Sequence, residues 1–520
     1  MRWRRVVREH GPLAAVVIAA GALAVLELRP GHDWGDDFAL YIDQARALVE
    51  GDVQEVIDRT TYTVRNSSWH SFSPYGYPWV VPLLLAPAYA LFGIDYDAFK
   101  VVELVFFLGF LVVLHALLRP RLGRVATLAI VAFVGLNQAY TGWVNSVLSE
   151  FPFAFFVAAS LLAIERVFAA SRFGNDPPRQ PPWWALAGVG VLLGVCANVR
   201  TEGVIVVLAL AARQALTAYD LRDDLRRLAI PFAVPYVAGG LFHLLLNVLL
   251  PSDPGTAIDD SGGMGFHNWD VNISYYGDVL SGMFGLDGWW LALVLMLIIV
   301  HALSGVLVRW REDLPLALTT LGLAFVYLSV PFREVRYLYV VMPLALYFAV
   351  HGVRRLDLRV VPRSVPSGVL PVLGVLALVA FNTRPLASAV DYWRTYPDAV
   401  NGPHTPDTEE MWDEVRAVTE ADDLVAFFRA RTMNLYTGRQ GLQLTSLPQI
   451  LERADWYVMA RGSTYSQCLI DDDIAAATNG RLEKVWENGV DGAGWTIWRV
   501  DRSKPLDPAQ LAALPPCRPA

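Results

Sequence analysis

The chain has 520 residues, of which 54% are hydrophobic and 18% charged, and its mean hydropathy is +0.37. Soluble globular chains contain roughly 45–50% apolar and about 25% charged residues, so this composition argues against an ordinary soluble enzyme and against a disordered chain. Three cysteines are too few for a disulfide-rich secreted scaffold, and a net charge of −8 gives no indication of nucleic-acid binding.

Charged residues are unevenly distributed along the chain. They occupy about 15% of positions 1–383 and about 25% of positions 384–520. We therefore expect a membrane-embedded body at 1–383 and a water-soluble domain at 384–520.

Apolar runs dominate the first part. A helix that crosses about 30 Å of hydrocarbon needs about 20 mostly apolar residues. The first run follows four arginines and has no small-residue cleavage site before Arg29, so we interpret it as a retained helix rather than a signal peptide. Eleven runs predict transmembrane helices: 11–28, 99–118, 124–141, 150–168, 183–199, 202–219, 228–250, 288–308, 314–331, 336–351 and 367–383.

Loop charge predicts the orientation of these helices. The loop 251–287 contains six Asp and no Arg or Lys, whereas the N-terminus and every second loop are rich in arginine. Because positively charged loops stay in the cytoplasm, we expect the N-terminus inside and, after an odd number of spans, the C-terminal domain outside. The segment 29–98 and the loop 251–287 then also lie outside. Within the former, 78–92 is too short to span and is expected in the membrane interface or as a re-entrant segment.

Two adjacent carboxylates, Asp36 and Asp37, follow the first span at the predicted start of a helix. Asp is a preferred N-cap residue, and a second Asp suits the first turn, so spacing alone favours a structural role. Their position at the mouth of a membrane body also suits acid–base chemistry. The spacing leaves both interpretations open.

Five short motifs occur in chain order between positions 37 and 337. Together they resemble those of the GT-C superfamily of multi-span glycosyltransferases, most closely the branch of protein O-mannosyltransferases and lipid A aminoarabinose transferases. The motifs are Asp37-x-x-x-Tyr41-x-x-x-Ala45-Arg46, Pro74-Tyr-Gly-Tyr-Pro78 followed by the apolar stretch 83–93, Leu148-Ser149-Glu150, Arg200-Thr201-Glu202-Gly203 and Arg333-Glu334-Val335-Arg336-Tyr337.

Three positions depart from the pattern of that branch. The branch often has Asp-Glu where this chain has Asp37-Phe38, so a second carboxylate is missing or displaced to Asp36. Phe151 and Thr201 stand where the branch has proline. Substrate identity is therefore the least transferable property.

The apolar runs, the loop charges and the resemblance together lead us to expect a polytopic α-helical plasma (inner) membrane protein of GT-C-like fold with about eleven spans and a small extracytoplasmic α/β domain. It implies transfer of a hexose or pentose from a polyprenyl-phosphate donor in the lipid bilayer to an extracytoplasmic glycan, lipid or protein. In the mechanism we expect, Asp37, or else Asp36, accepts the proton of the acceptor hydroxyl in a single inverting displacement. Arg200, Arg333 and Arg336 are expected to stabilise the leaving phosphate, although Arg333 is equally suited to snorkel to lipid headgroups.

Further motif residues are candidates for substrate binding. Glu202 and Tyr337 adjoin the arginines, and Glu150 begins a helix, where an acidic residue is also ordinary. His70, Tyr75 and Tyr77 are candidates to shape the sugar or acceptor site, but an interfacial aromatic belt explains such residues equally well.

Metal binding has no diagnostic spacing in this sequence. The candidate oxygen and nitrogen ligands for a hard cation are Asp36, Asp37, Asp259, Asp260, His267 and Asp270. The branch that the chain resembles is usually counted as metal-independent, so we expect no cofactor. The loop 251–287, with Gly262, Gly263 and Gly265, is either a lid over the site or an ordinary surface loop.

The C-terminal part has the pattern of a small α/β domain. A helix is expected from Thr405 to Val418, strands within 424–428, 456–459, 482–486 and 495–500, and a further helix at 447–453. The domain either engages the acceptor and covers the site or acts as a stabilising cap. Cys468 and Cys517 are expected to form a disulfide in this oxidising compartment.

Alternative functions remain open at this stage. A transporter or lipid-linked glycan flippase would share the multi-span pattern, although internal repeats expected of many transporters are not evident. A ligase or polymerase of diphosphate-linked glycans and a non-catalytic scaffold are the other candidates.

Overall fold

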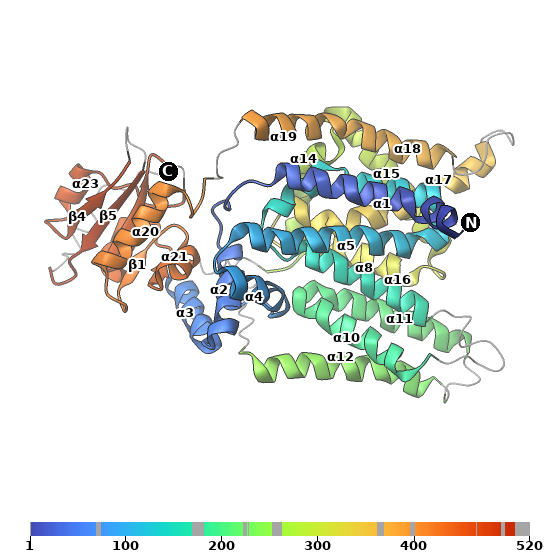
Figure 1. The fold of residues 1–520 in the computed structure, drawn as a ribbon, viewed down its shortest axis with the longest axis horizontal. Coiled ribbons are helices and arrows are strands. Elements are labelled where there is room, and N and C mark those ends of the chain that lie inside the picture. The colour runs from blue at the N-terminus through green and yellow to red at the C-terminus, as the bar shows by residue number, and fades with distance from the viewer. Residues whose placement is uncertain are drawn as a thin grey trace.

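A bundle of helices and a separate sheet domain make up the chain (Figure 1). The computed structural model describes residues 2–68, 74–168, 181–221, 226, 228–251, 263–360, 369–395, 401–463, 465–489 and 494–504. We call the end of the bundle that faces the sheet domain the domain-side end and the opposite end the far end.

Each of the eleven predicted apolar runs lies on a helix or on a bent helix pair. Among the described residues, seven helices are long and apolar enough to cross a membrane, or eight if the bent pair at 124–145 is one span, so the chain is a membrane protein. The count of eleven spans stays a prediction. The bundle helices are α1 (Arg2–Glu27), α5 (Tyr96–Leu122), α6 (Arg124–Gly135), α7 (Gln138–Thr141), α8 (Glu150–Val167), α10 (Trp183–Val199), α11 (Val204–Asp220), α12 (Ala229–Leu249), α14 (Trp269–Phe284), α15 (Gly288–Arg309), α16 (Leu314–Ser329), α17 (Leu338–Val360), α18 (Val369–Phe381) and α19 (Thr383–Thr395).

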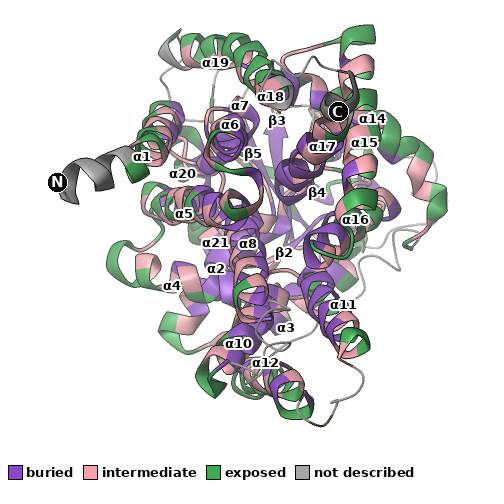
Figure 2. Ribbon diagram, turned by 90° about the vertical axis from the view of Figure 1, so that its right-hand side faces the viewer, coloured by how far each residue is buried: buried purple, intermediate pink, exposed green. Residues whose placement is uncertain are grey.

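The residues at the centre of the bundle are buried and many at its periphery are exposed (Figure 2). Helices α12 and α15 expose large apolar residues such as Leu241 and Leu307, as expected for surfaces that contact lipid. Helices α15 and α17 pack closely because glycine lies at their contact. A Cβ atom at Gly305 would lie 1.9 Å from the carbonyl oxygen of Phe348, and one at Gly352 would lie 2.0 Å from that of His301.

The arginine-rich helix ends share one end of the bundle. The C-terminal ends of α5, α8, α11, α15 and α17 and the N-terminal end of α1 all lie at the far end (Figure 1). The charge asymmetry seen in the sequence is therefore an asymmetry between the two ends of the bundle. The orientation of the bundle in a membrane stays a prediction.

Three short helices lie between the bundle and the sheet domain: α2 (Asp37–Glu50), α3 (Val53–Asn66) and α4 (Val80–Phe92) (Figure 1). Helix α2 ends at Gly51, whose φ of 93° is a left-handed conformation that favours glycine. Helix α4 has 13 residues and packs against α2 and α5. A helix of this length rises only about 20 Å, which agrees with the expectation that it does not span a membrane.

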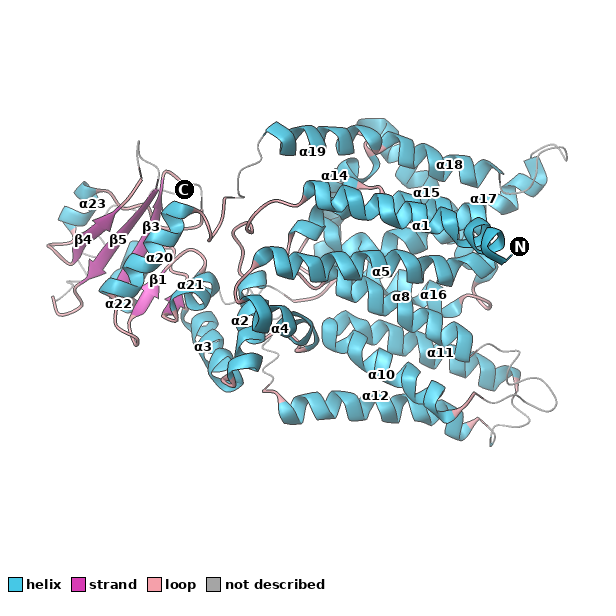
Figure 3. Cartoon of the chain, in the orientation of Figure 1, coloured by secondary structure: helices cyan, strands magenta, loops and turns pink. Residues whose placement is uncertain are grey.

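The sheet domain contains five strands flanked by helices (Figure 3). The strand order is β2-β1-β3-β5-β4; β1 is parallel to β2 and β3, and β5 is antiparallel to β3 and β4. The prediction of a small α/β domain is confirmed, but β2, α21 and α23 were not predicted. The elements are α20 (Pro406–Val418), β1 (Leu424–Ala426), α21 (Ala430–Thr437), β2 (Gln440–Leu442), α22 (Leu447–Arg453), β3 (Trp456–Arg461), α23 (Asp472–Ala477), β4 (Leu482–Glu487) and β5 (Gly494–Val500).

The boundary expected at 383/384 falls inside a helical stretch. Val372–Tyr392 is one candidate span that includes parts of α18 and α19, and the first helix of the sheet domain begins at Pro406. Cys468 is disulfide-bonded, whereas Cys196 is a buried free thiol. The expected partner, Cys517, lies outside the described residues.

The sheet domain is docked tightly on α2 and α3. The indole of Trp34 lies edge-on within 5.1–6.4 Å of five aromatic rings of the sheet domain, those of Trp412, Phe427, Phe428, Tyr465 and Trp495. The Thr63 hydroxyl donates to the carbonyl of Gly441 at 2.9 Å. Apolar and polar contacts together thus fix the sheet domain over the domain-side end.

Candidate functional site

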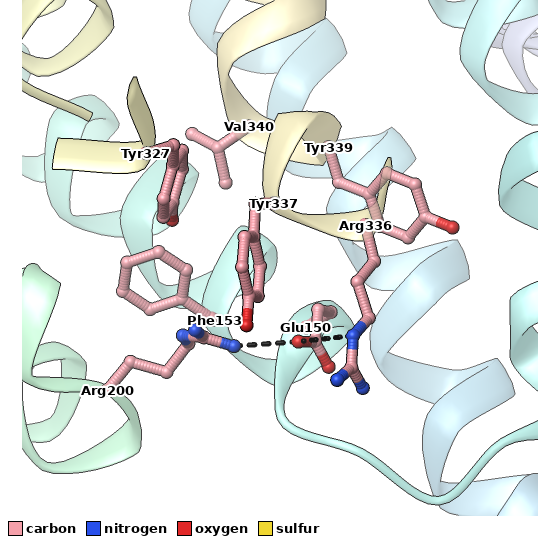
Figure 4. Close-up of a pocket in the computed structure, with 8 residues that line it drawn as sticks. All are labelled: Glu150, Phe153, Arg200, Tyr327, Arg336, Tyr337, Tyr339 and Val340. Carbon is pink, nitrogen blue, oxygen red and sulfur yellow. Dashed lines mark hydrogen bonds and ion pairs between the residues drawn. The ribbon is translucent and has the colours of Figure 1, made fainter. Parts of the chain in front are cut away.

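A small, partly open pocket lies at the domain-side end of the bundle. Its walls come from the start of α8, the α10–α11 junction, the end of α16 and the start of α17. Eight residues line it (Figure 4): Glu150, Phe153, Arg200, Tyr327, Arg336, Tyr337, Tyr339 and Val340. Four of these were predicted from the motifs.

Glu150 bridges two arginines in the pocket (Figure 4). Its Oε1 lies 2.7 Å from Nη1 of Arg200 and 3.4 Å from Nε of Arg336. Arg200 also pairs through Nη2 with Glu202 at 2.9 Å. The phenol ring of Tyr337 lies between the guanidinium groups, 5.1 Å from Cζ of Arg200 and 5.9 Å from Cζ of Arg336. All five residues were candidates for substrate binding, and the structure brings them together; their role in binding stays a prediction.

Local backbone structure explains why these charges converge. Glu150 is the first residue of α8, Arg200 follows the last residue of α10, and Arg336 lies in the 3₁₀ turn η6 (Val335–Tyr337) that precedes α17. All three positions are helix ends at the same end of the bundle. Charged groups at such ends are placed in the pocket without entering the apolar middle of a span.

Three polar atoms of the cluster have no hydrogen-bond partner among the described residues. They are the buried Nε atoms of Arg200 and Arg336 and the buried Oε2 of Glu150. Buried polar groups are nearly always paired in native structures. An unpaired guanidinium N–H beside a pocket can donate a hydrogen bond to an anionic ligand.

Asp37 lies beside this cluster. Its Oδ1 accepts a hydrogen bond from the Tyr77 hydroxyl at 2.6 Å, and its Oδ2 lies 3.3 Å from Nη2 of Arg336. The side chain is 39% exposed. Burial raises the pKa of the Asp37 carboxyl, but the charge of Arg336 and the Tyr77 hydrogen bond outweigh it, so this pKa lies below its ordinary value. Asp37 is therefore an ionised, accessible carboxylate next to the pocket.

Asp36 has a different environment. Its Oδ1 accepts a hydrogen bond from the backbone N–H of Arg431 at 3.3 Å, and its Oδ2 lies 3.4 Å from Nη1 of Arg429. It is only 7% exposed, and burial raises its pKa despite the two arginines. The Asp36 carboxylate thus caps the first turn of α21 in the sheet domain and makes no capping bond to its own helix.

The remaining predicted residues lie outside the pocket lining. Arg333 is exposed, and the described part of the chain gives it no hydrogen bond or ion pair. The ring of Tyr75 lies 5.1 Å from Cζ of Arg65. His70 falls outside the described residues.

Several site residues were missed by sequence reasoning. Phe153 and Tyr339 lie three residues after predicted motif residues, a spacing that places them on the same helix face, so this signal was present. Tyr327 stacks on Tyr337 at 5.2 Å and lies within an ordinary apolar run, which gave no signal. Arg431 belongs to the sheet domain, 395 positions from the residue it contacts.

No group of three or more His, Cys, Asp or Glu side chains in the described ranges is arranged to hold a metal ion. His267 and Asp270 are exposed, and Asp259 and Asp260 fall outside the described residues. The expectation of no cofactor stays a prediction. Much of the segment expected as a loop at 251–287 is helix α14, where Asn272 donates to the carbonyl of Val330 at 2.8 Å.

Solved structures provide the comparison with known proteins, since no sequence-family model and no curated protein sequence matches the chain. The structure of ArnT from Cupriavidus metallidurans bound to undecaprenyl phosphate aligns with a TM-score of 0.56 at 13% identity, covering 94% of this chain and 98% of ArnT. The apo oligosaccharyltransferase of Archaeoglobus fulgidus aligns with a TM-score of 0.50 at 12% identity, covering 90% of this chain and 70% of that protein. Both are GT-C glycosyltransferases, so the expected GT-C fold is confirmed.

Proposed function

We propose that this chain is a membrane glycosyltransferase that moves a sugar from a polyprenyl-phosphate donor to an acceptor at the domain-side end. The observation that carries the proposal is the Arg200–Glu150–Arg336 pocket with Asp37 beside it. The fold supports it, because ArnT shares this fold and its structure holds undecaprenyl phosphate.

The arginines suit a phosphate group in this pocket. Arginine stays protonated, and its planar fork matches phosphate oxygens. The pocket is small and lined by charged and aromatic side chains, so it suits the phosphate group of the donor rather than a whole lipid-linked sugar. The prenyl chain then remains in the bilayer while the phosphate displaces Glu150 from one or both guanidinium groups. Charge that develops on the leaving phosphate is stabilised by the same groups.

Asp37 serves as general base in this mechanism. The acceptor oxygen attacks the anomeric carbon, the bond from that carbon to the phosphate oxygen breaks, and the acceptor proton passes to Asp37. In the free protein the charge of Arg336 holds the pKa of Asp37 low, which makes the carboxylate a weak base. A donor phosphate beside Arg336 neutralises part of that charge, so donor binding strengthens the base. One displacement inverts the anomeric centre.

The proposed orientation follows the charge asymmetry. The far end carries the arginine-rich helix ends, and positively charged ends stay cytoplasmic. The pocket and the sheet domain then lie on the extracytoplasmic face of the plasma membrane. We include in the proposal an extracytoplasmic glycan, lipid or protein as acceptor.

The test offers purified protein in nanodiscs a panel of undecaprenyl-phosphate sugars and detects bound donor and transferred sugar by mass spectrometry. We expect one donor to be retained and consumed, and Arg200→Ala to abolish retention. Arg311→Gln is the control, because Arg311 is 52% exposed and pairs with Asp220 at the C-terminal end of α11. Retention no tighter than that of undecaprenol, or lipid movement across liposomes without any sugar transfer, overturns the proposal.

A further inference from the structure

Arg431 is a buried arginine at the junction between the sheet domain and the bundle. It lies in the first turn of α21 and is 1% exposed. Arginine is almost never fully buried unless its charge is compensated. The groups that contact Arg431 therefore indicate its role.

The contacts of Arg431 lead to the candidate base. Its Nη2 donates to the carbonyl oxygen of Pro74, and its Cζ lies 5.5 Å from the centre of the Tyr77 ring. Tyr77 in turn donates its hydroxyl to Asp37 at 2.6 Å. Arg431 thus holds both the start of the 74–78 segment and the ring whose hydroxyl orients the carboxylate.

The other side of the Tyr77 segment is held by the helix that carries Asp37. Gln44 on α2 accepts a hydrogen bond from the Tyr77 backbone N–H and donates one to its carbonyl, both at 3.0 Å. The ring of Tyr41, also on α2, stacks on Tyr77 with centroids 4.2 Å apart. Tyr77 is thus held by Gln44 and Tyr41 from α2 and by Arg431 from the sheet domain.

We propose that Arg431 is a positioning residue for Asp37, acting through Pro74 and Tyr77, so that the sheet domain completes the catalytic site. The inference rests on the proposed function for the role of Asp37. It separates the two roles left open for the domain, because a stabilising cap does not need a buried cation beside the base.

Charges around Asp37 give the expected pH effect. Arg336 from η6, Tyr77 from the 74–78 segment and Arg431 from α21 lower its pKa, and burial opposes them. Asp36 and Glu334 are further carboxylates whose charges interact with Asp37, while the pKa of His32 is lowered to about 3 by burial, which leaves it neutral. Removal of the Arg431 charge therefore moves the pKa of Asp37 upward.

The test compares Arg431→Gln, Arg431→Lys and the control Arg481→Gln. Arg481 is another buried arginine of the sheet domain, 5% exposed, whose Nη2 donates to the carbonyl of Leu451 at 3.0 Å. Infrared difference spectra of each protein against its Asp37→Asn counterpart follow the titration of the Asp37 carboxyl without any need for turnover. Transfer assays add kcat and donor KM.

We expect Arg431→Gln to raise the Asp37 midpoint by roughly one pH unit, because an opposite charge nearby lowers a carboxyl pKa by about 1–3 units, and to reduce kcat at least tenfold. Arg431→Lys keeps the charge, and so the midpoint, but loses the planar contact with Tyr77, and its kcat falls severalfold. Arg481→Gln lowers the melting temperature and leaves the midpoint unchanged.

An unchanged midpoint in folded Arg431→Gln, or a wild-type kcat in Arg431→Lys, overturns the inference. If Arg431→Gln does not fold, the kcat of Arg431→Lys decides. Absence of transfer by the wild-type protein with every donor counts against the proposed function instead, and the infrared midpoints still test the link between Arg431 and Asp37.

Discussion

Helix α8 has a charged cluster at each end, and the two clusters use the same residue types differently. At the domain-side end Glu150 meets Arg200 and Arg336 around a pocket. At the far end Glu165 meets Arg121, which also pairs with Asp313 at 2.6 Å. Fifteen residues of α-helix separate the clusters by about 22 Å.

The difference lies in how completely the arginines are paired. Arg121 donates from Nε, Nη1 and Nη2 to Asp313, the Leu117 carbonyl and Glu165. Arg200 donates from both Nη atoms, but its Nε has no partner among the described residues, and it borders a pocket. An arginine that is paired through Nε and both Nη atoms holds helices together, whereas one with an unpaired Nε at a pocket retains capacity for a ligand.

The largest effect is expected when the carboxylate beside the pocket loses its charge. Asp37→Asn removes the base while keeping the size of the side chain, so kcat falls about 10²–10⁴-fold with little change in melting temperature. A reconstituted transfer assay measures the effect. Near-normal transfer by this variant would remove Asp37 from the catalytic role.

The far-end cluster is expected to respond in stability rather than in transfer. Arg121→Gln leaves Glu165 and Asp313 without their shared cation, and breaking a buried ion pair costs about 3–5 kcal/mol. Unfolding by denaturing detergent measures the loss, and donor KM stays near the wild-type value. Unchanged stability with impaired transfer would contradict the assignment of a structural role to the far-end cluster and a ligand-binding role to the domain-side cluster.

Arg200→Lys tests the geometry of the pocket cluster. Lysine keeps the charge but loses the fork that reaches Glu150 and Glu202 together, so kcat/KM falls about 10–100-fold, equivalent to about 1.4–2.7 kcal/mol. Steady-state kinetics with the donor identified above measures it. Arg333→Lys is the control, because Arg333 is exposed and outside the pocket lining; equal losses in both variants would contradict the assignment.

Asp36→Asn sharpens the contrast between the adjacent carboxylates. The amide oxygen still accepts from the Arg431 N–H, and only the ion pair with Arg429 is lost, so stability falls by about 1 kcal/mol. The kcat value stays within about threefold of wild type, because the substitution removes the Asp36–Arg429 ion pair and leaves the proposed base, Asp37, in place. Thermal unfolding and the transfer assay together measure this, and a loss as large as that of Asp37→Asn would assign both carboxylates to catalysis.

The smallest expected effect is that of mild acid on activity. The reaction needs Asp37 ionised, and its pKa lies below the ordinary value. Activity is therefore kept as pH falls from 7 to 5 and is lost only near and below the ordinary carboxyl range, about pH 4. A kcat/KM profile of the wild-type protein checks this; a midpoint above pH 5 assigned to Asp37 would contradict it.

Much of the fold was predictable because it depends on local patterns. Apolar runs placed the bundle helices other than α14 and α19, and short apolar runs placed β1, β3, β4 and β5. Strand β2 was missed because Gln440–Leu442 has three residues and no apolar alternation. The residues Glu150, Arg200 and Arg336 were found because their motifs resemble those of a known family, and each lies at a helix end that an apolar run had already marked.

The separation of Asp36 from Asp37 was not predictable. The side chains of consecutive helix residues point about 100° apart, so the two carboxylates must face different neighbours. Which one faces the pocket depends on the docking of α21, hundreds of residues later in the chain. Nothing in the local pattern around Arg431 indicates that it lies beside Tyr77.

The docking of α21 on Asp36 also has a consequence for biogenesis. The contacting residues are 395 positions apart, so a ribosome that adds about 5–20 residues per second needs ~20–80 s to make the second partner after the first. Throughout that interval Trp34 lacks the aromatic rings that surround it in the finished protein. The nascent segment around Trp34 is thus expected to bind chaperones, and a chain truncated before α20 would present quality-control proteases with an exposed tryptophan and a carboxylate that lacks its partners.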